Sequence, residues 1–204
     1  MLAHMEPSET IGVFGGSFDP PHIAHAMCIV WALESGAVDR VAMVPAARHA
    51  FHKARHAPYE HCLAMCRLAV AGLGDRVFVS DAEGLRPGFS YMIDTLATLI
   101  AEHPAARFRL IVGSDVAAEV ATWREGPRVK ELAPPLEIPR GRTGERVGDR
   151  PFFLPNISST AAREALRSGG DCHMMLCKPV REYIRRHGLY GLPAEPTPSE
   201  AATP

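Results

Sequence analysis

Apolar residues along the chain alternate between short continuous runs and longer stretches with helical spacing. A continuous run is typical of a strand buried on both faces of a sheet, and these runs predict strands at 10–14, 41–44, 77–80, 107–112, 136–138 and 152–154. Apolar spacings of three and four residues between them predict helices at 22–35, 59–71, 90–102, 115–132, 159–167 and 180–187. Ser90 is the predicted N-cap of the third helix, and Gly126 with Pro127 is predicted to interrupt the fourth. Strands that alternate with helices predict an α/β fold, a Rossmann-like doubly wound parallel sheet in a single domain.

The composition is that of a soluble globular protein. Of the 204 residues, 47% are hydrophobic and 22% are charged, and the formal net charge is -1. A balance this close to neutral argues against partners recognised by bulk electrostatics, so neither nucleic acid nor a membrane surface is expected. No apolar run reaches the roughly 20 residues of a membrane span, and residues 1–10 lack the pattern of a secretory signal. We therefore expect a cytoplasmic protein, with homo-oligomerisation left open.

The chain end and the cysteines add two further expectations. The predicted domain spans 1–192, and residues 193–204 are rich in Pro, Ala, Ser and Thr, which predicts a disordered tail. Five cysteines at irregular spacing favour reduced thiols over a disulfide framework. A zinc site built from Cys62, Cys66, Cys172 and Cys177 is the less favoured alternative, because the chain has no C-x-x-C pair.

The first predicted strand leads through a glycine turn into a helix. Residues 15–25 read Gly-Gly-Ser-Phe-Asp-Pro-Pro-His-Ile-Ala-His, which is neither a P-loop nor the G-x-G-x-x-G fingerprint. Glycines let backbone amides approach a phosphate, and the helix start adds its positive end. His22 and His25 are three residues apart and share one face of the first turn. Because the helix dipole opposes imidazolium there, the pair indicates a phosphate site better than it indicates two ordinary surface histidines.

A second helix start, at 156–163, carries the same chemistry. Its sequence is Asn-Ile-Ser-Ser-Thr-Ala-Ala-Arg, which alone predicts no more than an N-cap. Next to the first turn, its hydroxyls, its free amides and Arg163 predict a second anion site. Two such sites in one crevice indicate a polyphosphate ligand.

From 10 to 192 the sequence resembles the bacterial nicotinate-mononucleotide adenylyltransferases of the nucleotidyltransferase superfamily. The resemblance rests on the segments at 15–25, 51–53 (Phe-His-Lys), 90–96 (Ser-Tyr-Met-Ile-Asp-Thr-Leu), 112–115 (Val-Gly-Ser-Asp), 157–163 and 180–190, and on Trp123. The segments at 15–25 and 157–163 specify only the superfamily, whereas 90–96, Trp123 and the ending specify this family. The resemblance implies that ATP adenylates nicotinate mononucleotide, giving deamido-NAD and pyrophosphate in NAD biosynthesis without a covalent enzyme intermediate.

The resemblance also implies roles for individual residues. His22 and His25 would hold the ATP phosphates, with His25 near the α-phosphoryl group and Arg163 at the β- and γ-phosphates. The implied ATP-binding residues are Gly15, Gly16, Ser17, Phe18, Gly113, Asp115, Ser158, Ser159 and Thr160. The implied substrate-binding residues are His52, Lys53, Tyr91, Met92 and Trp123, of which Trp123 would stack on the pyridine ring. Mg²⁺ would bind mainly through ATP oxygens, with no metal ligand from the protein.

Four residues depart from the usual pattern of that family: Ala24, Phe51, Met92 and Ala162. Met92 stands where Thr is usual, so one hydroxyl near the substrate carboxylate is missing, and we expect a narrower preference for nicotinate over nicotinamide. Two alternatives remain open. One is a related adenylyl- or cytidylyltransferase acting on nicotinamide mononucleotide or phosphopantetheine, and the other is a catalytically silent nucleotide-binding protein.

Overall fold

The computed structural model describes residues 9–48, 55–86, 88–138, 155 and 157–194. Within them the strands are β1 (Glu9–Gly16), β2 (Arg40–Pro45), β3 (Val77–Val79), β4 (Ala106–Gly113) and β5 (Pro135–Ile138). The α-helices are α1 (Ile23–Glu34), α2 (Tyr59–Val70), α3 (Met92–Glu102), α4 (Ser114–Ala117), α5 (Gly126–Leu132), α6 (Ser159–Arg167) and α7 (Lys178–Arg186). Short 3-10 helices η1 (Ala71–Leu73), η2 (Ala118–Thr122) and η3 (Leu189–Gly191) complete these elements.

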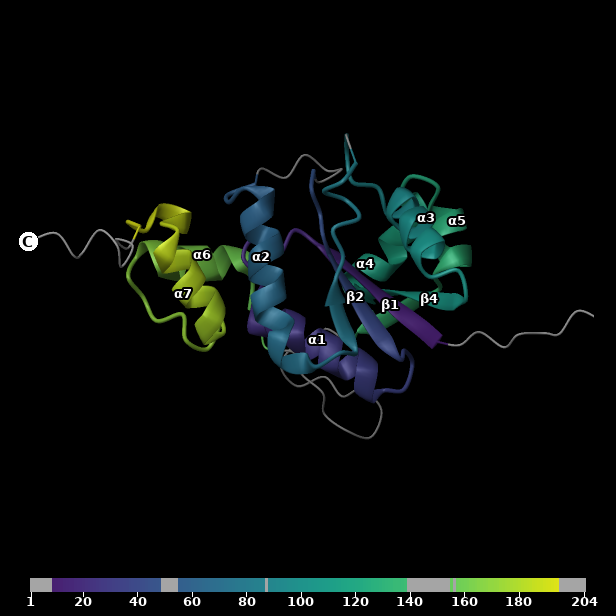
Figure 1. Cartoon of the computed structure of the whole chain (residues 1–204), viewed down its shortest axis with the longest axis horizontal. Helices are drawn as coiled ribbons and strands as arrows, with labels where there is room; N and C mark the ends of the chain where they lie inside the picture. The colour runs from purple at the N-terminus through teal and green to yellow at the C-terminus, as the bar shows by residue number, and fades with distance from the viewer. Residues whose placement is uncertain (1–8, 49–54, 87, 139–154, 156, 195–204) are drawn as a thin grey trace, which may run out of the picture.

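The strands form one parallel sheet in the order β3-β2-β1-β4-β5. The chain runs outward from β1 through β2 and β3 and then returns to β4 on the other side of β1, as the ribbon in Figure 1 shows. The order therefore reverses between β1 and β4. In open parallel sheets, ligands bind beyond the carboxyl ends of the strands at this switch point. The predicted Rossmann-like parallel sheet is confirmed.

Helices bury both faces of the sheet. Successive side chains on a strand point to opposite faces, and on β1 Val13 belongs to one apolar cluster while Phe14 belongs to another. Helices α1 and α2 contribute to the cluster around Phe14, and α3 and α5 contribute to the cluster around Val13. Gly12, also on β1, packs closely against β4: a Cβ there would lie 2.6 Å from Ile111 Cδ1, so the Ile111 side chain would have to move. The continuous apolar runs of the sequence thus correspond to strands covered on both sides.

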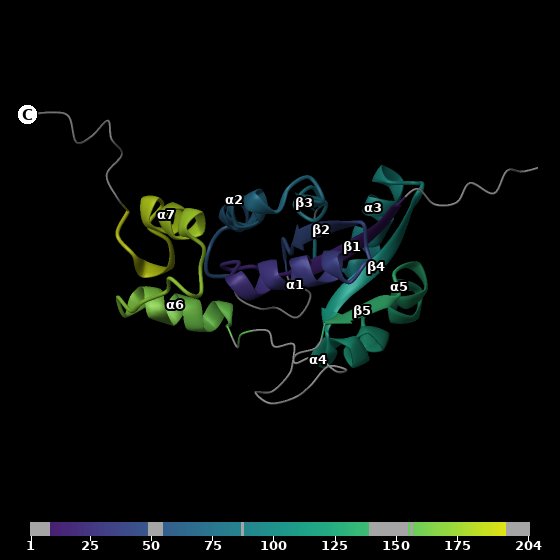
Figure 2. The ribbon, with the colours of Figure 1, turned by 90° about the horizontal axis from the view of Figure 1, so that it is seen from below.

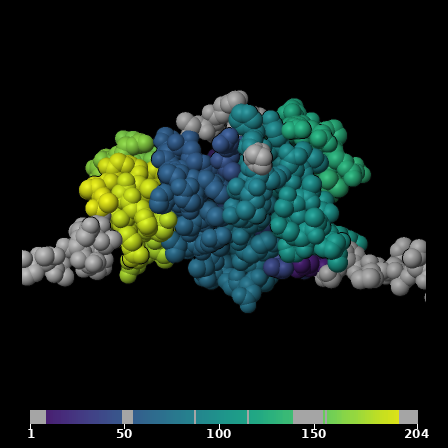
Figure 3. Space-filling model, turned by 45° about the horizontal axis from the view of Figure 1, so that its top comes forward, coloured from purple at the N-terminus to yellow at the C-terminus, as the bar shows by residue number. Residues whose placement is uncertain are grey.

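A third apolar cluster joins the C-terminal helices to α2. It contains Cys62 and Met65 from α2, Leu166 from α6, and Val180 and Ile184 from α7. Figures 1 and 2 both place α6 and α7 beside α2, at the end of the molecule opposite α3 and α5. Figure 3 shows the yellow C-terminal segment in contact with blue α2. This packing brings the C-terminal part of the chain close to the turn that follows β1.

The predicted N-cap of α3 is wrong. Helix α3 begins one residue later than predicted for a Ser90 cap, with Tyr91 as its N-cap. The Ser90 hydroxyl instead accepts hydrogen bonds from the backbone N–H groups of Ala47 and Arg48, each at 3.1 Å. The hydroxyl therefore ties two loops together rather than starting a helix.

Two further helix boundaries differ because proline is favourable in a first helical turn, where its missing N–H has no helical partner. The predicted break of the stretch at 115–132 into two helices is confirmed, but it falls at 123–125, so that Gly126 and Pro127 open α5. Helix α7 begins at Lys178 rather than at 180, with Pro179 in its first turn. The predicted strand at 152–154 and the tail from 195 onward lie outside the described residues.

All five cysteines are free, and four of them are buried. Within the described ranges there is no group of three or more His, Cys, Asp or Glu side chains that could hold a metal ion. No helix in this part of the chain is both long and apolar enough to cross a membrane.

Candidate active site

The candidate site begins where β1 leads into the turn before α1. A Cβ on Gly16 would lie 2.9 Å from the ring of Phe18, so a larger residue there would displace that ring. Phe18 has a φ of 45°, a left-handed conformation that is uncommon for a bulky residue. Its buried ring lies edge-on to the rings of Phe14 and His25, with centroids 5.4 and 4.8 Å away. The strained backbone at Phe18 thus places its aromatic ring beside His25. The preceding residue, Ser17, is half-buried.

The two histidines form the start of α1. The Nδ1 atom of His25 accepts a hydrogen bond from the backbone N–H of His22 at 3.0 Å, and the two rings stack with centroids 3.6 Å apart. Because Nδ1 accepts, a neutral His25 ring carries its proton on Nε2, which makes Nε2 the donor atom. The first turn of α1 contains no acidic residue. No acidic side chain therefore competes with an anion at this helix start, where the Ile23 N–H already donates to the Met175 carbonyl at 2.9 Å.

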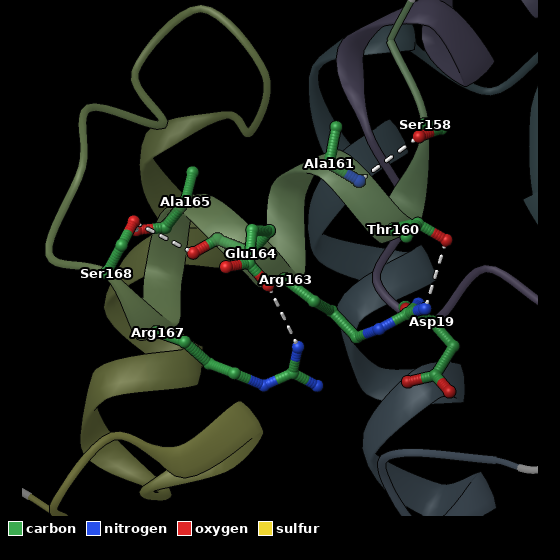
Figure 4. A network of polar contacts seen from close by, with 9 residues as sticks. All are labelled: Asp19, Ser158, Thr160, Ala161, Arg163, Glu164, Ala165, Arg167 and Ser168. Carbon is green, nitrogen blue, oxygen red and sulfur yellow. Dashed lines mark hydrogen bonds and ion pairs between the residues drawn. The ribbon is translucent and has the colours of Figure 1, made fainter.

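The start of α6 lies against the same turn, as Figure 4 shows for Asp19 and Arg163. The Nη1 atom of Arg163 donates to the backbone carbonyl of Asp19 at 2.6 Å, and its Nη2 atom donates to Thr160 Oγ1 at 3.2 Å. The Ser159 hydroxyl donates to the carbonyl of Pro20 at 2.9 Å. The structure thus brings together the two helix starts that the sequence predicts as phosphate sites, although Asp19 and Arg163 are 144 residues apart.

The first turn of α6 is capped from within its own segment. The Ser158 hydroxyl oxygen accepts a hydrogen bond from the N–H of Ala161 at 3.1 Å, and no acidic residue lies in that turn. Arg167, one turn further along, does not reach Asp19 in Figure 4 and pairs with Glu164 at 3.5 Å. Only the arginine nearer the helix start reaches the turn before α1.

The carboxylate of Asp19 lies buried beneath this turn. Its Oδ2 atom accepts from the backbone N–H of His56 at 2.7 Å. Its Oδ1 atom accepts from the N–H of Ala57 at 3.2 Å, from the hydroxyl of Tyr190 at 2.8 Å and from the thiol of Cys62 at 3.7 Å. Burial, and next the Asp19 charge, raise the pKa of Cys62 to about 12, so the thiol stays protonated as a donor. The sequence analysis assigned no role to Asp19. It is the one acidic residue in a turn predicted to bind an anion, which indicates that its carboxylate has a role other than binding the ligand.

The carboxyl ends of β1 and β4 meet at the switch point. The last pair between these two strands is Val13 with Leu110, and each strand ends three residues further on, β1 at Gly16 and β4 at Gly113. Gly113 ends β4, and Asp115 lies in α4 directly after it. These positions place the two predicted nucleotide-contacting segments side by side. The predicted residues at 52 and 53 lie outside the described residues.

Three predicted substrate residues lie on the α3 side of the site. The guanidinium carbon of Arg124 lies 4.6 Å from the ring centroid of Tyr91, the N-cap of α3. The Met92 methyl group lies next to Gly15, since a Cβ on that glycine would be 3.0 Å from Met92 Cε. Trp123 packs on the cluster around α3, and its buried Nε1 atom has no hydrogen-bond partner within the described residues. Met92 thus connects the α3 side of the site to the end of β1.

A buried network that sequence analysis did not find holds the segment leading to Tyr91. Glu83 and Thr95 are both buried, and the Thr95 hydroxyl donates to Glu83 Oε1 at 2.8 Å. The other Glu83 oxygen accepts from the N–H of Ala47 at 3.3 Å, and Arg86 donates to Thr95 Oγ1 at 3.0 Å. The network joins Glu83 and the first turns of α3 to Ala47, which follows β2. The arrangement as a whole offers phosphate donors on one side and an aromatic, apolar surface on the other.

The sequence is similar to that of known nucleotidyltransferases. Residues 13–165 match the family model described as cytidylyltransferase-like. The chain is 40% identical over 188 residues to a protein of Anaeromyxobacter sp. named "Probable nicotinate-nucleotide adenylyltransferase", covering 91% of this chain and 99% of that one. A Thermus thermophilus protein of the same name is 39% identical over 187 residues, covering 88% of this chain and 98% of the relative.

Solved structures share the fold. The model resembles Plasmodium falciparum nicotinic acid mononucleotide adenylyltransferase complexed with APC, with a TM-score of 0.72, over 92% of this chain and 100% of that chain. The same enzyme complexed with NaAD has a TM-score of 0.70. The sequence identities are 22% and 21%, so the likeness concerns the architecture alone.

Proposed function

The chain belongs to the nicotinate-nucleotide adenylyltransferases of the cytidylyltransferase-like family, and from this premise we propose that it transfers the adenylyl group of ATP to nicotinate mononucleotide. One observation supports this reaction most strongly. Two helix starts, free of acids in their first turns, are joined by the contacts of Ser159 with Pro20 and of Arg163 with Asp19. Helix starts so arranged suit a chain of phosphates.

In the proposed reaction, an oxygen of the mononucleotide 5′-phosphate attacks the α-phosphorus of ATP. A new P–O bond forms as the bond to the pyrophosphate oxygen breaks, so the products are deamido-NAD and pyrophosphate. Positioning and charge stabilisation can supply this catalysis without a covalent enzyme intermediate. We assign the Nε2 donor of His25 to the α-phosphoryl oxygen, where charge develops, because its Nδ1 atom is occupied by the N–H of His22.

Arg163 and the first-turn N–H groups of α6 are assigned to the β- and γ-phosphates. The Ser159 hydroxyl has a single hydrogen, which is donated to Pro20. Its contribution to phosphate binding therefore comes through the backbone. Arg163 already donates through both terminal nitrogens within its own turn and to Asp19, which holds the guanidinium at the junction of the two helix starts.

The pyridine ring is assigned to the α3 side of the site. Trp123 offers a stacking surface, and the first N–H groups of α3, at Met92 and Ile93, have no partners within the helix. A carboxylate only accepts hydrogen bonds and therefore suits these donors, whereas a carboxamide turns an NH₂ group toward one of them.

We propose Mg²⁺ as a cofactor that arrives on the nucleotide. The site residues fit a phosphate-borne ion, because Arg163 and the two helix starts complement phosphate, and the buried carboxylate of Asp19 already accepts from four donors. When bound, Mg²⁺ neutralises phosphate charge and favours departure of pyrophosphate. A cytoplasmic location fits an enzyme that consumes ATP.

The experiment is chromatography of the products formed from ATP and Mg²⁺ with nicotinate mononucleotide, nicotinamide mononucleotide or phosphopantetheine in parallel. We expect deamido-NAD and an equal amount of pyrophosphate, at a higher kcat/KM than for either competing acceptor. Faster turnover of phosphopantetheine or nicotinamide mononucleotide would reassign the substrate. Absence of pyrophosphate from all three mixtures, with intact folding by circular dichroism, would indicate a silent nucleotide-binding protein.

A further inference from the structure

The hydroxyl of Tyr190 reaches the phosphate-binding turn from the far end of the chain. Tyr190 lies in η3 after α7, 171 residues from Asp19, and its hydroxyl donates to Asp19 Oδ1 at 2.8 Å. The side chain is 6% exposed and packs in the third apolar cluster. Burial, and next the Asp19 charge, raise the pKa of this hydroxyl far above its usual range, so it remains a donor.

The backbone around Tyr190 is shaped to deliver that hydroxyl. Tyr190 has a φ of 61°, and the flanking Gly188 and Gly191 have φ values of 59° and 89°. A left-handed conformation at a large aromatic residue costs about 1–3 kcal/mol and persists only where the surroundings enforce it. The two glycines adopt such values at little cost. The tight turn thus directs a full aromatic side chain inward to Asp19.

Asp19 in turn connects several segments that surround the turn before α1. Its carboxylate accepts from the N–H groups of His56 and Ala57, and its carbonyl accepts from Arg163. Three residues further along the chain, His22 begins the histidine pair of α1. A shift of the Asp19 side chain would therefore be transmitted to both helix starts.

We propose that Tyr190 is a positioning residue for nucleotide binding, whose hydroxyl holds Asp19 and, through Asp19, fixes His22 and Arg163 at the polyphosphate. This inference rests on the proposed function for the identity of the nucleotide. It makes the C-terminal turn at 188–191 part of the ATP site, although this turn contributes no residue to the assigned phosphate contacts.

The test compares two substitutions that each remove one buried or half-buried tyrosine hydroxyl from the C-terminal region. Tyr190→Phe keeps the ring and removes the donor to Asp19. Tyr183→Phe, on α7, removes a hydroxyl whose partner is His61 Nδ1 at 2.9 Å. We expect Tyr190→Phe to raise the KM for ATP about tenfold, the effect of losing roughly one hydrogen bond to a charged group, with the KM for nicotinate mononucleotide unchanged. Tyr183→Phe should leave both constants unchanged.

A double-mutant cycle tests whether Tyr190 acts through Asp19. On an Asp19→Asn background, Tyr190→Phe should add less than a twofold change in the KM for ATP, because the shared contact is already altered. Independent effects that multiply would overturn the proposal. If the Asp19→Asn variant does not fold, the comparison of the two tyrosine variants decides alone. Equal KM values for ATP in Tyr190→Phe and wild type would then overturn it, whatever the thermal stabilities.

A binding measurement separates this inference from the proposed function. Titration calorimetry with α,β-methylene-ATP and Mg²⁺ requires no turnover, and we expect about tenfold weaker binding to Tyr190→Phe than to wild type. A wild-type protein that binds the analogue but forms no deamido-NAD would refute the proposed reaction. The comparison of its affinity with that of Tyr190→Phe would still test the role of Tyr190. Equal affinity of both proteins for the analogue would overturn the role of Tyr190 even in an active enzyme.

Discussion

The site has a side that we assign to the ATP phosphates, the phosphate side, and a side that we assign to the pyridine ring, the pyridine side. The side chains on these two sides are held in place by different forces. On the phosphate side, hydrogen bonds join distant segments, as between Arg163 and Asp19. On the pyridine side, a buried hydrogen-bond network around Glu83 and Thr95 fixes the backbone before α3, while the side chains of Met92 and Trp123 are held by packing and the Tyr91 ring by its contact with Arg124. Removing one partner of a hydrogen bond in a partly buried site leaves the other partner unsatisfied, which costs free energy. An apolar surface, by contrast, tolerates substitutions that conserve volume. We therefore expect phosphate-side substitutions to reduce turnover strongly, and pyridine-side substitutions to change mainly how the mononucleotide is bound and chosen.

The largest effect is expected for His25→Ala. Loss of a donor where charge develops should lower kcat for deamido-NAD formation about 10²–10³-fold. The substitution also removes the acceptor of the His22 N–H, so a modest fall in melting temperature should accompany it. Steady-state kinetics and thermal melts on the same preparations separate the two effects.

The matched control for His25 is His173→Ala, because the His173 side chain is 69% exposed and lies outside the site. Its kcat should equal that of wild type within twofold. A His25→Ala enzyme that also keeps kcat within a few-fold of wild type would remove the phosphate side from the chemistry and abolish the contrast between the two sides.

Arg163→Ala should have the next largest effect. The guanidinium joins both helix starts, so its loss should raise the KM for ATP about tenfold and also lower kcat. Arg167→Ala removes the same charge one turn away, where the guanidinium pairs with the exposed Glu164, an interaction worth about 0.2–1 kcal/mol. We expect little change in ATP kinetics for Arg167→Ala. Equal effects of both substitutions would point to general electrostatics rather than to a defined site.

On the pyridine side, Trp123→Leu should raise the KM for either mononucleotide about three- to tenfold, as expected from the loss of one stacking contact. The KM for ATP should not change. Trp31→Leu on α1 is the control, since Trp31 packs on the opposite face of the sheet. That variant should lower the melting temperature without affecting either KM. A larger effect of Trp123→Leu on ATP than on the mononucleotides would show that the two sides are not distinct.

Local sequence patterns predicted the elements best where a local contact defines them. Helix α6 begins and ends where predicted, because its N-cap, Ser158, accepts from an N–H only three residues away. Ser90 is likewise a serine directly before a predicted helix, but its hydroxyl accepts from backbone N–H groups 42 and 43 residues away, and the N-cap prediction fails there. Local patterns carry no information on which distant donor a side chain will meet.

The same reasoning explains what was predictable in the site. The His22 and His25 pair is visible from spacing alone, since both residues belong to one helical turn. The contact of Asp19 with Tyr190 joins positions 171 residues apart, and it depends on how α7 packs on α2. The sequence shows that Asp19 and Tyr190 are polar, but only the fold shows that they are in contact.

The smallest effect is expected for Met92→Thr, which concerns selectivity. Stacking on Trp123 cannot distinguish an acid from an amide, so selection depends on donors near the start of α3. At position 92, wild type offers a backbone N–H group and no side-chain donor, and we expect it to favour nicotinate mononucleotide by a modest ratio of kcat/KM values. A threonine hydroxyl would add one donor to the carboxylate, and Met92→Thr should widen that ratio about three- to tenfold, the effect of one hydrogen bond.

The substitution also removes a methyl group that lies against Gly15, so volume and hydrogen bonding change together. Met92→Val separates them, because valine has the shape of threonine without the hydroxyl. Both variants should lose about 1–3 kcal/mol of stability through the cavity they leave. Only the threonine variant should gain selectivity, measured as kcat/KM for both mononucleotides on all three proteins. Equal ratios in the two variants would show that the shape of this surface, rather than a missing donor, sets the choice, and a wild type that favours the amide would refute the assignment of the α3 start to a carboxylate.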